Sequence, residues 1–214
     1  MPIYRFWAKL HHALVPFFAS STKDAWAKGT SVVVPVGDVG DYRYQLGDAF
    51  FVAPLLAPGG TRDVAFPPGS RYVDYWDDTV HDGGTTAAAY DAVDRMRYPL
   101  FLREGAIVPM EADGALMVLV VPSASSAFHL VEEDGSETQL AASGKTVTID
   151  RALRTTIFRV FAETPPTKVT RDGTDLPQSA TRPDFDGSTS SFFIEGKRVW
   201  IKLPAGAGAS FTLE

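Results

Sequence analysis

The acidic side chains in the first half of the chain are the residues whose chemistry is easiest to name. Six aspartates lie between positions 74 and 94, namely Asp74, Asp77, Asp78, Asp82, Asp91 and Asp94. Two carboxylates that face each other across a sugar can act as the nucleophile and the general acid/base of a glycosidase. Such a pair is defined in space, and the sequence singles out no two of the six. Since most of them fall in turns or on polar strand faces, we assign no catalytic residue to this chain.

An aromatic run, Tyr72-Val73-Asp74-Tyr75-Trp76, overlaps these carboxylates. Aromatic rings can stack on sugar rings, so Tyr75 and Trp76 are the candidate substrate-binding residues. In a strand, alternation would place Tyr72, Asp74 and Trp76 on one face and Val73 and Tyr75 on the other. One of these faces would belong to the core of a sandwich. Core packing is therefore the competing interpretation of the same rings.

Two short motifs imitate ligand sites but lack a required part. Asp184-Phe185-Asp186-Gly187 has calcium-like spacing, but the downstream bidentate glutamate is missing because Glu195 follows an apolar strand. We expect an exposed Asp-Gly turn there. Ser143-Gly144-Lys145-Thr146 resembles the end of a phosphate-binding loop, but Gln139 replaces the first glycine and strand follows strand. That segment is expected to be a hairpin turn.

The histidines show no metal-ligand spacing; they are His11, His12, His81 and His129. No Gly-x-Ser-x-Gly nucleophile motif occurs either. We therefore predict no metal site and no cofactor.

Composition narrows the class of protein. The 214 residues carry a net charge of −6, with a pI near 5.2 and no cysteine. The acidic balance argues against nucleic acid and against anionic membranes as partners. The sequence contains no apolar run of the ~18 residues that a membrane span needs. The N-terminal segment does not read as a signal peptide, which leaves the compartment open between cytoplasm and periplasm.

One helical region precedes a β-rich remainder. Residues 3–28 carry apolar side chains at helical spacing, with a break expected at Pro16, a restart capped by the run Ser20-Ser21-Thr22, and an end at Gly29. The aromatic-rich face of this helix cannot remain in water. It must pack on a sheet or another domain, and it makes association through the exposed face possible.

The remainder reads as strands. Ser31–Val36 has no alternating polar residue, which favours a strand buried on both faces, as in a parallel sheet. Residues 85–97 are expected to be extended. Beyond Ala115, strands recur every ~8–12 residues with hairpin signals at Asp134-Gly135 and Asp172-Gly173, the pattern of a β-sandwich.

Several motifs resemble, in order, those of glycoside hydrolase family 31, the α-glucosidase and α-xylosidase family. Gly47–Leu55 is similar to the family's G-D-x-L-L-V-A-P-V segment. The others are Leu14–Phe18 with Ala27–Thr30, Arg62–Gly69, Arg71–Trp76, His81–Gly84 and Tyr98–Met110. Five of these elements follow one another in the family's order from Gly47 to Met110, and the upstream pair extends the match over about a hundred residues, which makes the resemblance specific.

The resemblance implies a mostly β fold, in which two β-sandwich domains follow the last helix and strand of a truncated (β/α)₈ barrel. Residues 1–45 would be the barrel remnant, 46–114 the proximal sandwich and 115–214 the distal one. It implies retaining hydrolysis of α-linked oligosaccharides or glycosides by the complete enzyme. A barrel needs ~250 residues, and the family's catalytic aspartates precede anything that matches here. This chain alone is therefore predicted to be inactive.

One further departure and two alternatives remain. Val34-Pro35-Val36 stands where the family has R-P-L, so a substrate-side arginine is also absent. A non-catalytic carbohydrate-binding module would need Tyr75 or Trp76 exposed, whereas a purely structural β-sandwich would bind no sugar. The sequence leaves open the sugar and linkage, the oligomeric state, and whether Met1 is the true start.

Overall fold

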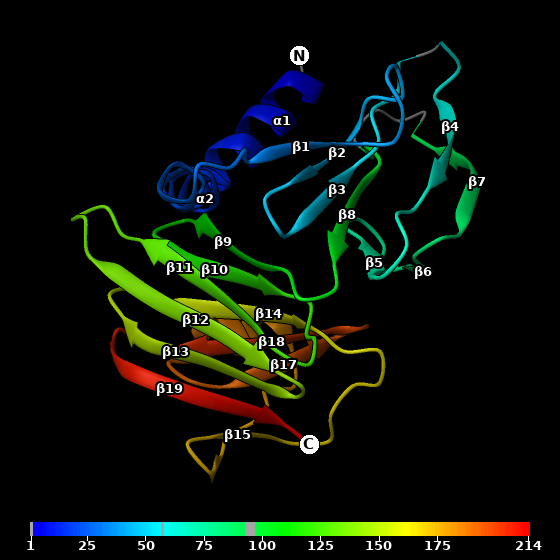
Figure 1. Ribbon diagram of the computed structural model, residues 1–214. Coiled ribbons are helices and arrows are strands. Elements are labelled where there is room, and N and C mark those ends of the chain that lie inside the picture. The colour runs from blue at the N-terminus through cyan, green and yellow to red at the C-terminus, as the bar shows by residue number, and fades with distance from the viewer. Residues whose placement is uncertain (1, 57, 93–96) are drawn as a thin grey trace. The chain divides into compact units, whose positions relative to one another are not determined.

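The N-terminal segment forms two helices in a computed structural model, which describes residues 2–56, 58–92 and 97–214 (Figure 1). Helix α1 spans Pro2–Ala13 and helix α2 spans Val15–Lys28. The predicted break is confirmed. It falls at Leu14, because Pro16 sits in the first turn of α2, where a missing N–H costs nothing.

The predicted restart after Ser20 is wrong, because α2 continues without interruption to Lys28. The Ser20 hydroxyl instead donates to the Pro16 carbonyl at 2.7 Å and accepts the Val131 N–H at 2.9 Å. The end at Gly29 is confirmed. Gly29 has φ +64°, and the N–H groups of Gly29 and Thr30 donate to the Trp26 and Ala25 carbonyls, which is the Schellman arrangement.

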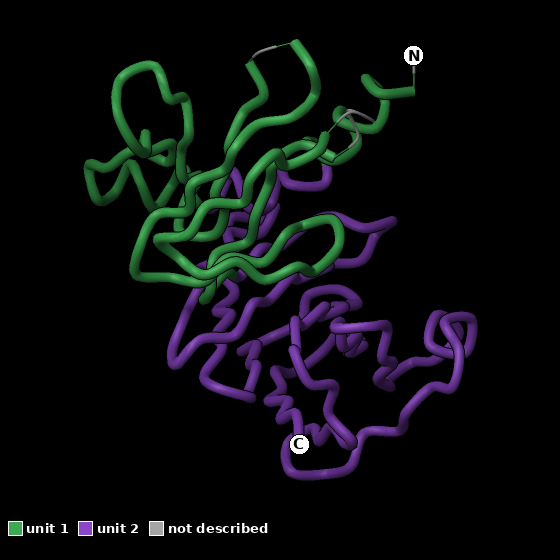
Figure 2. Tube along the Cα trace, turned by 90° about the vertical axis from the view of Figure 1, so that its right-hand side faces the viewer, with its two compact units in different colours: residues 1–12, 21–106 green, residues 13–20, 107–214 purple. Residues whose placement is uncertain are grey.

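The chain folds into two compact units (Figure 2). Residues 1–12 and 21–106 form unit 1, and residues 13–20 and 107–214 form unit 2. In the described part of the chain, no helix is both long enough and apolar enough to cross a membrane.

Unit 1 contains a six-stranded sheet in the order β1-β2-β3-β8-β5-β6. Its strands are β1 Val33–Val36, β2 Arg43–Leu46, β3 Phe50–Val52, β5 Arg71–Asp74, β6 Val80–Asp82 and β8 Leu100–Arg103. A separate two-stranded sheet pairs β4, Thr61–Ala65, with β7, Thr86–Asp91. The core of the unit gathers Phe51, Ala53, Val64, Phe66, Tyr72 and Phe101.

Strand β1 corrects the expectation for Ser31–Val36. It pairs antiparallel with β2 at the edge of the sheet, and its Val33 and Val34 side chains are exposed. The run is uniformly apolar, but the described residues supply no layer that covers it. Strand β7 confirms the extended structure expected after Thr85, whereas residues 93–96, including the candidate Asp94, lie outside the described residues.

Unit 2 is a β-sandwich of two sheets. One sheet has the order β17-β18-β14-β10-β9 and the other the order β11-β12-β13-β19-β15-β16. The first comprises β9 Ile107–Ala112, β10 Ala115–Val120, β14 Thr156–Phe161, β17 Phe192–Glu195 and β18 Arg198–Leu203. The second comprises β11 Ser126–Val131, β12 Glu137–Ser143, β13 Thr146–Ala152, β15 Val169–Arg171, β16 Thr174–Asp175 and β19 Gly206–Leu213.

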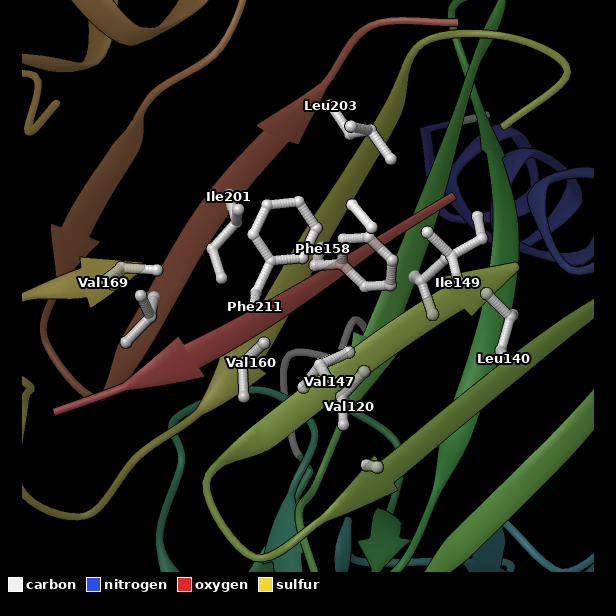
Figure 3. Packing of buried hydrophobic residues seen from close by; sticks show 14 of the residues in the cluster. Val120, Leu140, Val147, Ile149, Phe158, Val160, Val169, Ile201, Leu203 and Phe211 are labelled. Carbon is white, nitrogen blue, oxygen red and sulfur yellow. The ribbon is translucent and has the colours of Figure 1, made fainter. Parts of the chain in front are cut away.

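The two sheets of unit 2 share one hydrophobic core (Figure 3). Phe158 and Ile201 come from the first sheet, and Leu140, Val147 and Phe211 come from the second. Alternation along each strand places these side chains between the sheets. Burial of this apolar surface is the main stabilising term for the unit.

The local turn signals of unit 2 are confirmed with one exception. Asp134-Gly135 joins β11 to β12, Asp172-Gly173 joins β15 to β16, and Ser143–Thr146 forms the turn between β12 and β13. The expected turn at Asp184–Gly187 instead belongs to helix α3, Arg182–Gly187. The Thr181 side chain accepts the Asp184 N–H and the Asp184 carboxylate accepts the Thr181 N–H, a capping box that starts the helix.

Candidate functional site

The candidate residues Tyr75 and Trp76 lie immediately beyond the end of β5, in unit 1. The Asp74 carboxylate accepts the Trp76 N–H at 2.8 Å, a side-chain turn that ends the strand. The alternation expected for Tyr72 to Trp76 therefore stops at Asp74, and the placement of Trp76 by strand periodicity is wrong.

The Trp76 indole is held from several sides. Its Nε1–H donates to the Tyr98 carbonyl at 2.6 Å. Ring centroids lie 5.7 Å from Trp7, 5.9 Å from Phe6 and 4.8 Å from Tyr75. Phe6 and Trp7 belong to α1, so these rings attach that helix to the sheet of unit 1. We call the set Phe6, Trp7, Tyr75, Trp76 and Tyr98 the aromatic anchor.

A hydrogen-bonded pair, Asp74 and Tyr90, adjoins the aromatic anchor. Asp74 is 2% exposed, and its second carboxylate oxygen accepts the Tyr90 hydroxyl at 2.7 Å. This bond ties β7 to β5. Burial raises the pKa of Asp74, opposed by the hydrogen bonds from Tyr90 and Trp76. Burial and the bond to Asp74 likewise raise the pKa of Tyr90.

His81 lies near Asp74 but packs as a ring. It stacks on Phe66, with centroids 4.6 Å apart, and meets the Phe101 ring edge-on at 5.6 Å. Burial lowers the pKa of His81, because desolvation disfavours the charged imidazolium more than the nearby carboxylates favour it. Its geometry is that of a core histidine.

A cluster of charged side chains links β2 to β4 of the two-stranded sheet. Arg43 binds Asp41 through two nitrogens, and Arg62 donates to the Pro54 carbonyl at 2.6 Å and to Asp41 at 3.3 Å. The hydrogen bond from Arg43 is the largest reason that the pKa of Asp41 is lowered.

Within the aromatic anchor, burial raises the pKa of Tyr98 to about 12, which keeps its hydroxyl protonated.

These contacts determine which chemistry the site supports. Both oxygens of Asp74 accept hydrogen bonds in a buried position, where the carboxylate cannot reach a substrate. Asp77 accepts the Thr79 N–H at 2.9 Å, and Asp82 lies 3.5 Å from the Arg71 guanidinium. Across residues 2–56, 58–92 and 97–214, no three His, Asp or Glu side chains are grouped so that they could hold a metal ion. In the described residues, these carboxylates therefore hold parts of the fold together.

Sequence reasoning found Tyr75 and Trp76 but not their partners. Trp7 lies about seventy residues from Trp76, and Tyr90 lies sixteen residues from Asp74. Helical spacing indicated that Trp7 needs a partner. Local sequence carries no signal for which ring supplies it.

The fold and the site thus define a mostly β protein whose N-terminal helix rests on aromatic rings. Residues 16–108 match the family model described as the glycosyl hydrolase family 31 C-terminal domain. Over this segment, the match confirms the resemblance drawn from the motifs.

Curated relatives support the same assignment. An isomaltosyltransferase of Sporosarcina globispora is 22% identical over 92% of this chain and 21% of its own length. An α-glucosidase of Saccharolobus solfataricus is 28% identical over 49% of this chain and 16% of its own length. The chain thus spans about a fifth or less of these relatives.

Solved structures extend the similarity over the whole chain. A cycloalternan-forming enzyme of Listeria monocytogenes, solved with a pentasaccharide substrate, is 26% identical with a TM-score of 0.88, covering 100% of this chain and 23% of that enzyme. A family 31 dextranase of Flavobacterium johnsoniae has a TM-score of 0.81 at 18% identity, covering 100% of this chain and 32% of the dextranase. The second match shows the fold alone.

Proposed function

We propose that this chain is the C-terminal accessory portion of a retaining α-glycosidase of the α-glucosidase or α-xylosidase type. The observation that carries this proposal is the match of TM-score 0.88 at 26% identity over the full chain. The catalytic carboxylates would come from a (β/α)₈ barrel, which the present residues would support. The substrate of the complete enzyme would be an α-linked oligosaccharide or glycoside.

In this proposal, residues 1–45 supply the last helix and strand of that barrel, residues 46–114 the proximal sandwich and residues 115–214 the distal one. The exposed valines of β1 support the assignment. A uniformly apolar strand that lies bare at a sheet edge is expected where another layer belongs.

The DNA upstream of Met1 tests this proposal. An open reading frame that encodes two spaced aspartate motifs on barrel strands would support it. A frame interrupted directly upstream, with no barrel-encoding gene nearby, would contradict it.

The apolar surface that a barrel would cover makes association possible. Large side chains are exposed on α1, α2 and β1 of unit 1: Ile3, Tyr4, Trp26, Val33 and Val34. Exposed apolar surface of this kind drives proteins together. We expect the purified chain to sediment as a concentration-dependent oligomer, and Trp26→Ser with Tyr4→Ser to shift it toward monomer. A monomeric wild-type chain at all concentrations would argue against an uncovered interface.

The sugar-binding alternative rests on Tyr75 and Trp76 and stays a prediction. Stacking on a sugar needs one open ring face. The Trp76 ring contacts Phe6, Trp7 and Tyr75, and both candidate side chains are half-buried. No contact in the described residues favours this alternative over the accessory role.

A further inference from the structure

The sequence contains five Asp-Gly pairs, at positions 82–83, 113–114, 134–135, 172–173 and 186–187. In such a pair, the glycine nitrogen can attack the aspartate Cγ because glycine carries no Cβ to obstruct it. The ring that forms then reopens to aspartate or isoaspartate. The five pairs differ in how the fold holds them, and the difference selects one.

We infer that Asp113-Gly114 is the pair at which the folded protein converts to isoaspartate, with Glu111 as the base. It forms the two-residue turn between β9 and β10, where Ala112 pairs with Ala115. Both turn residues have positive φ, +49° and +81°, and both are exposed.

The other four aspartates are held by their surroundings. Asp134 accepts the Ser136 N–H at 2.9 Å, and Asp172 accepts the Ser210 N–H at 2.9 Å. Asp186 accepts Arg182 Nε at 2.9 Å inside α3. Asp82 pairs with Arg71, and Gly83 is so tightly packed that a Cβ would lie 2.4 Å from the Ser70 carbonyl oxygen.

The carboxylate of Asp113, by contrast, accepts no hydrogen bond from the residues that the structure describes. Space around Gly114 is also open, with no heavy atom within 4 Å of a Cβ built there. The electrophile and the attacking nitrogen can therefore approach each other without displacing packed groups.

Glu111 supplies the feature that the other pairs lack. Its Oε1 accepts the N–H of Gly114, the attacking nitrogen, at 3.1 Å. That distance lies within the reach of a general base. Its Oε2 lies 3.7 Å from Arg154, which orients the carboxylate. At the pair 134–135, the equivalent N–H donates to the Glu132 backbone carbonyl, which is not a base.

The chemical step balances without a co-reactant. The Gly114 nitrogen forms a bond to Cγ of protonated Asp113 while its proton passes to Glu111. The Cγ–OH bond breaks, and the hydroxyl leaves as water with that proton. Hydrolysis of the five-membered ring at the Asp113 backbone carbonyl then routes the main chain through the former side chain. The extra backbone atom no longer fits a two-residue turn, so the β9–β10 hairpin is weakened.

The test is an ageing experiment on the full chain in native buffer. Isoaspartate is quantified over weeks by enzymatic methylation and located by peptide fragmentation. We expect position 113 to lead the other four positions. We expect two variants of Glu111 each to slow conversion roughly tenfold. Glu111→Gln keeps a hydrogen-bond acceptor but removes the base, and Glu111→Asp moves the carboxylate away from the Gly114 nitrogen. Asp113→Glu should abolish the signal from that peptide.

Ageing in concentrated urea provides the structural control. There the five pairs should react at comparable rates, and the Glu111 variants should match the wild type. Unfolding midpoints of the variants establish that they remain folded in native buffer. A different leading position in native buffer, no isoaspartate at position 113, or unchanged rates in both Glu111 variants would overturn the inference.

Discussion

At the scale of single residues, Trp76 is the side chain whose role the structure specifies most fully. Its N–H reaches the Tyr98 carbonyl, and its ring contacts two aromatic rings of α1. A tryptophan used in this way stabilises a helix that otherwise buries no residue of its own. The role of the Trp76 side chain is therefore to attach α1 to the rest of unit 1.

Substitution of Trp76 tests that role. We expect Trp76→Ala to lower the free energy of unfolding by about 2 kcal/mol, less than the ~3–5 kcal/mol of a fully buried ring because the side chain is half-exposed. Trp76→Phe should cost about 1 kcal/mol, the value of the lost hydrogen bond. Urea unfolding measures both. Trp26, 88% exposed, is the matched control, and an equal loss in Trp26→Ala would contradict the assignment.

Asp74 gives the protein a pH dependence with a defined sign. Its folded-state pKa is raised above the ordinary 3.8, so the folded state holds the proton more tightly than the unfolded state does. The resulting stability is fully present below the unfolded pKa and is lost as pH rises through the folded value. Asp74→Asn removes this titration.

We therefore expect the stability of the wild type, relative to Asp74→Asn, to fall as pH rises from about 4 toward about 7. Urea midpoints for both proteins across that series measure it. His81, whose pKa is lowered from 6.5, contributes the opposite trend in both proteins. In Asp74→Asn that trend is larger because the Asp74 charge that favours the imidazolium is gone, so it reinforces the fall in the difference. A difference that stays constant with pH would show that Asp74 does not titrate there.

At the scale of elements, α3 depends on one buried cation. Lys202 of β18 is 7% exposed, and its Nζ donates to the carbonyls of Phe185 at 2.7 Å, Asp186 at 2.8 Å and Ser188 at 3.2 Å. The last carbonyls of a helix have no partner within the helix. A charged donor at that end satisfies them and complements the helix dipole.

Lys202→Met should therefore loosen α3. The variant keeps the apolar stem but leaves three carbonyls without their donor, at a cost of about 2–3 kcal/mol. Hydrogen exchange across residues 182–188 should accelerate more than exchange in the β13–β19 pair. Lys145→Met, at an exposed turn, is the control. Unchanged protection of α3 in Lys202→Met would show that Lys202 does not stabilise this helix.

Elements with local signals could be predicted from the sequence. Pro16 and Gly29 bound α2, and Asp-Gly pairs mark the hairpins, because backbone restrictions at these residues act without tertiary help. Helix α3 was missed although Thr181 and Asp184 form its capping box. A six-residue helix is stable only through tertiary contacts, here the burial of its Phe185 and the donor Lys202, which lies outside any local window.

Long-range pairings could not be predicted. The parallel neighbours β10 and β14 are about forty residues apart, and β13 pairs with β19 across about sixty. The aromatic anchor depends in the same way on Trp7 meeting Tyr98. Periodicity predicts which side chains are buried, whereas which strand or ring covers them is decided by the whole fold. The exposure of β1 could not be foreseen, because its sequence fits a strand with a layer on each side.

At the scale of the whole molecule, the proposed role is that of an accessory portion of a glycosidase whose catalytic residues lie elsewhere. The chain forms two compact units, residues 16–108 match the family 31 C-terminal domain, and the described carboxylates of the candidate site serve the fold. The acceleration of glycoside cleavage needs an acid and a nucleophile placed on either side of the bond. Since none of the described carboxylates of the candidate site is placed for this chemistry, we expect this chain alone not to cleave glycosides.

Hydrolysis of nitrophenyl α-glucoside and α-xyloside by the purified 214-residue chain tests this claim most directly. A family 31 α-glucosidase serves as the positive control, and a heat-inactivated sample of the chain sets the background. We expect release of nitrophenol at the background rate for both substrates. Sustained release above background that co-purifies with the chain would contradict it.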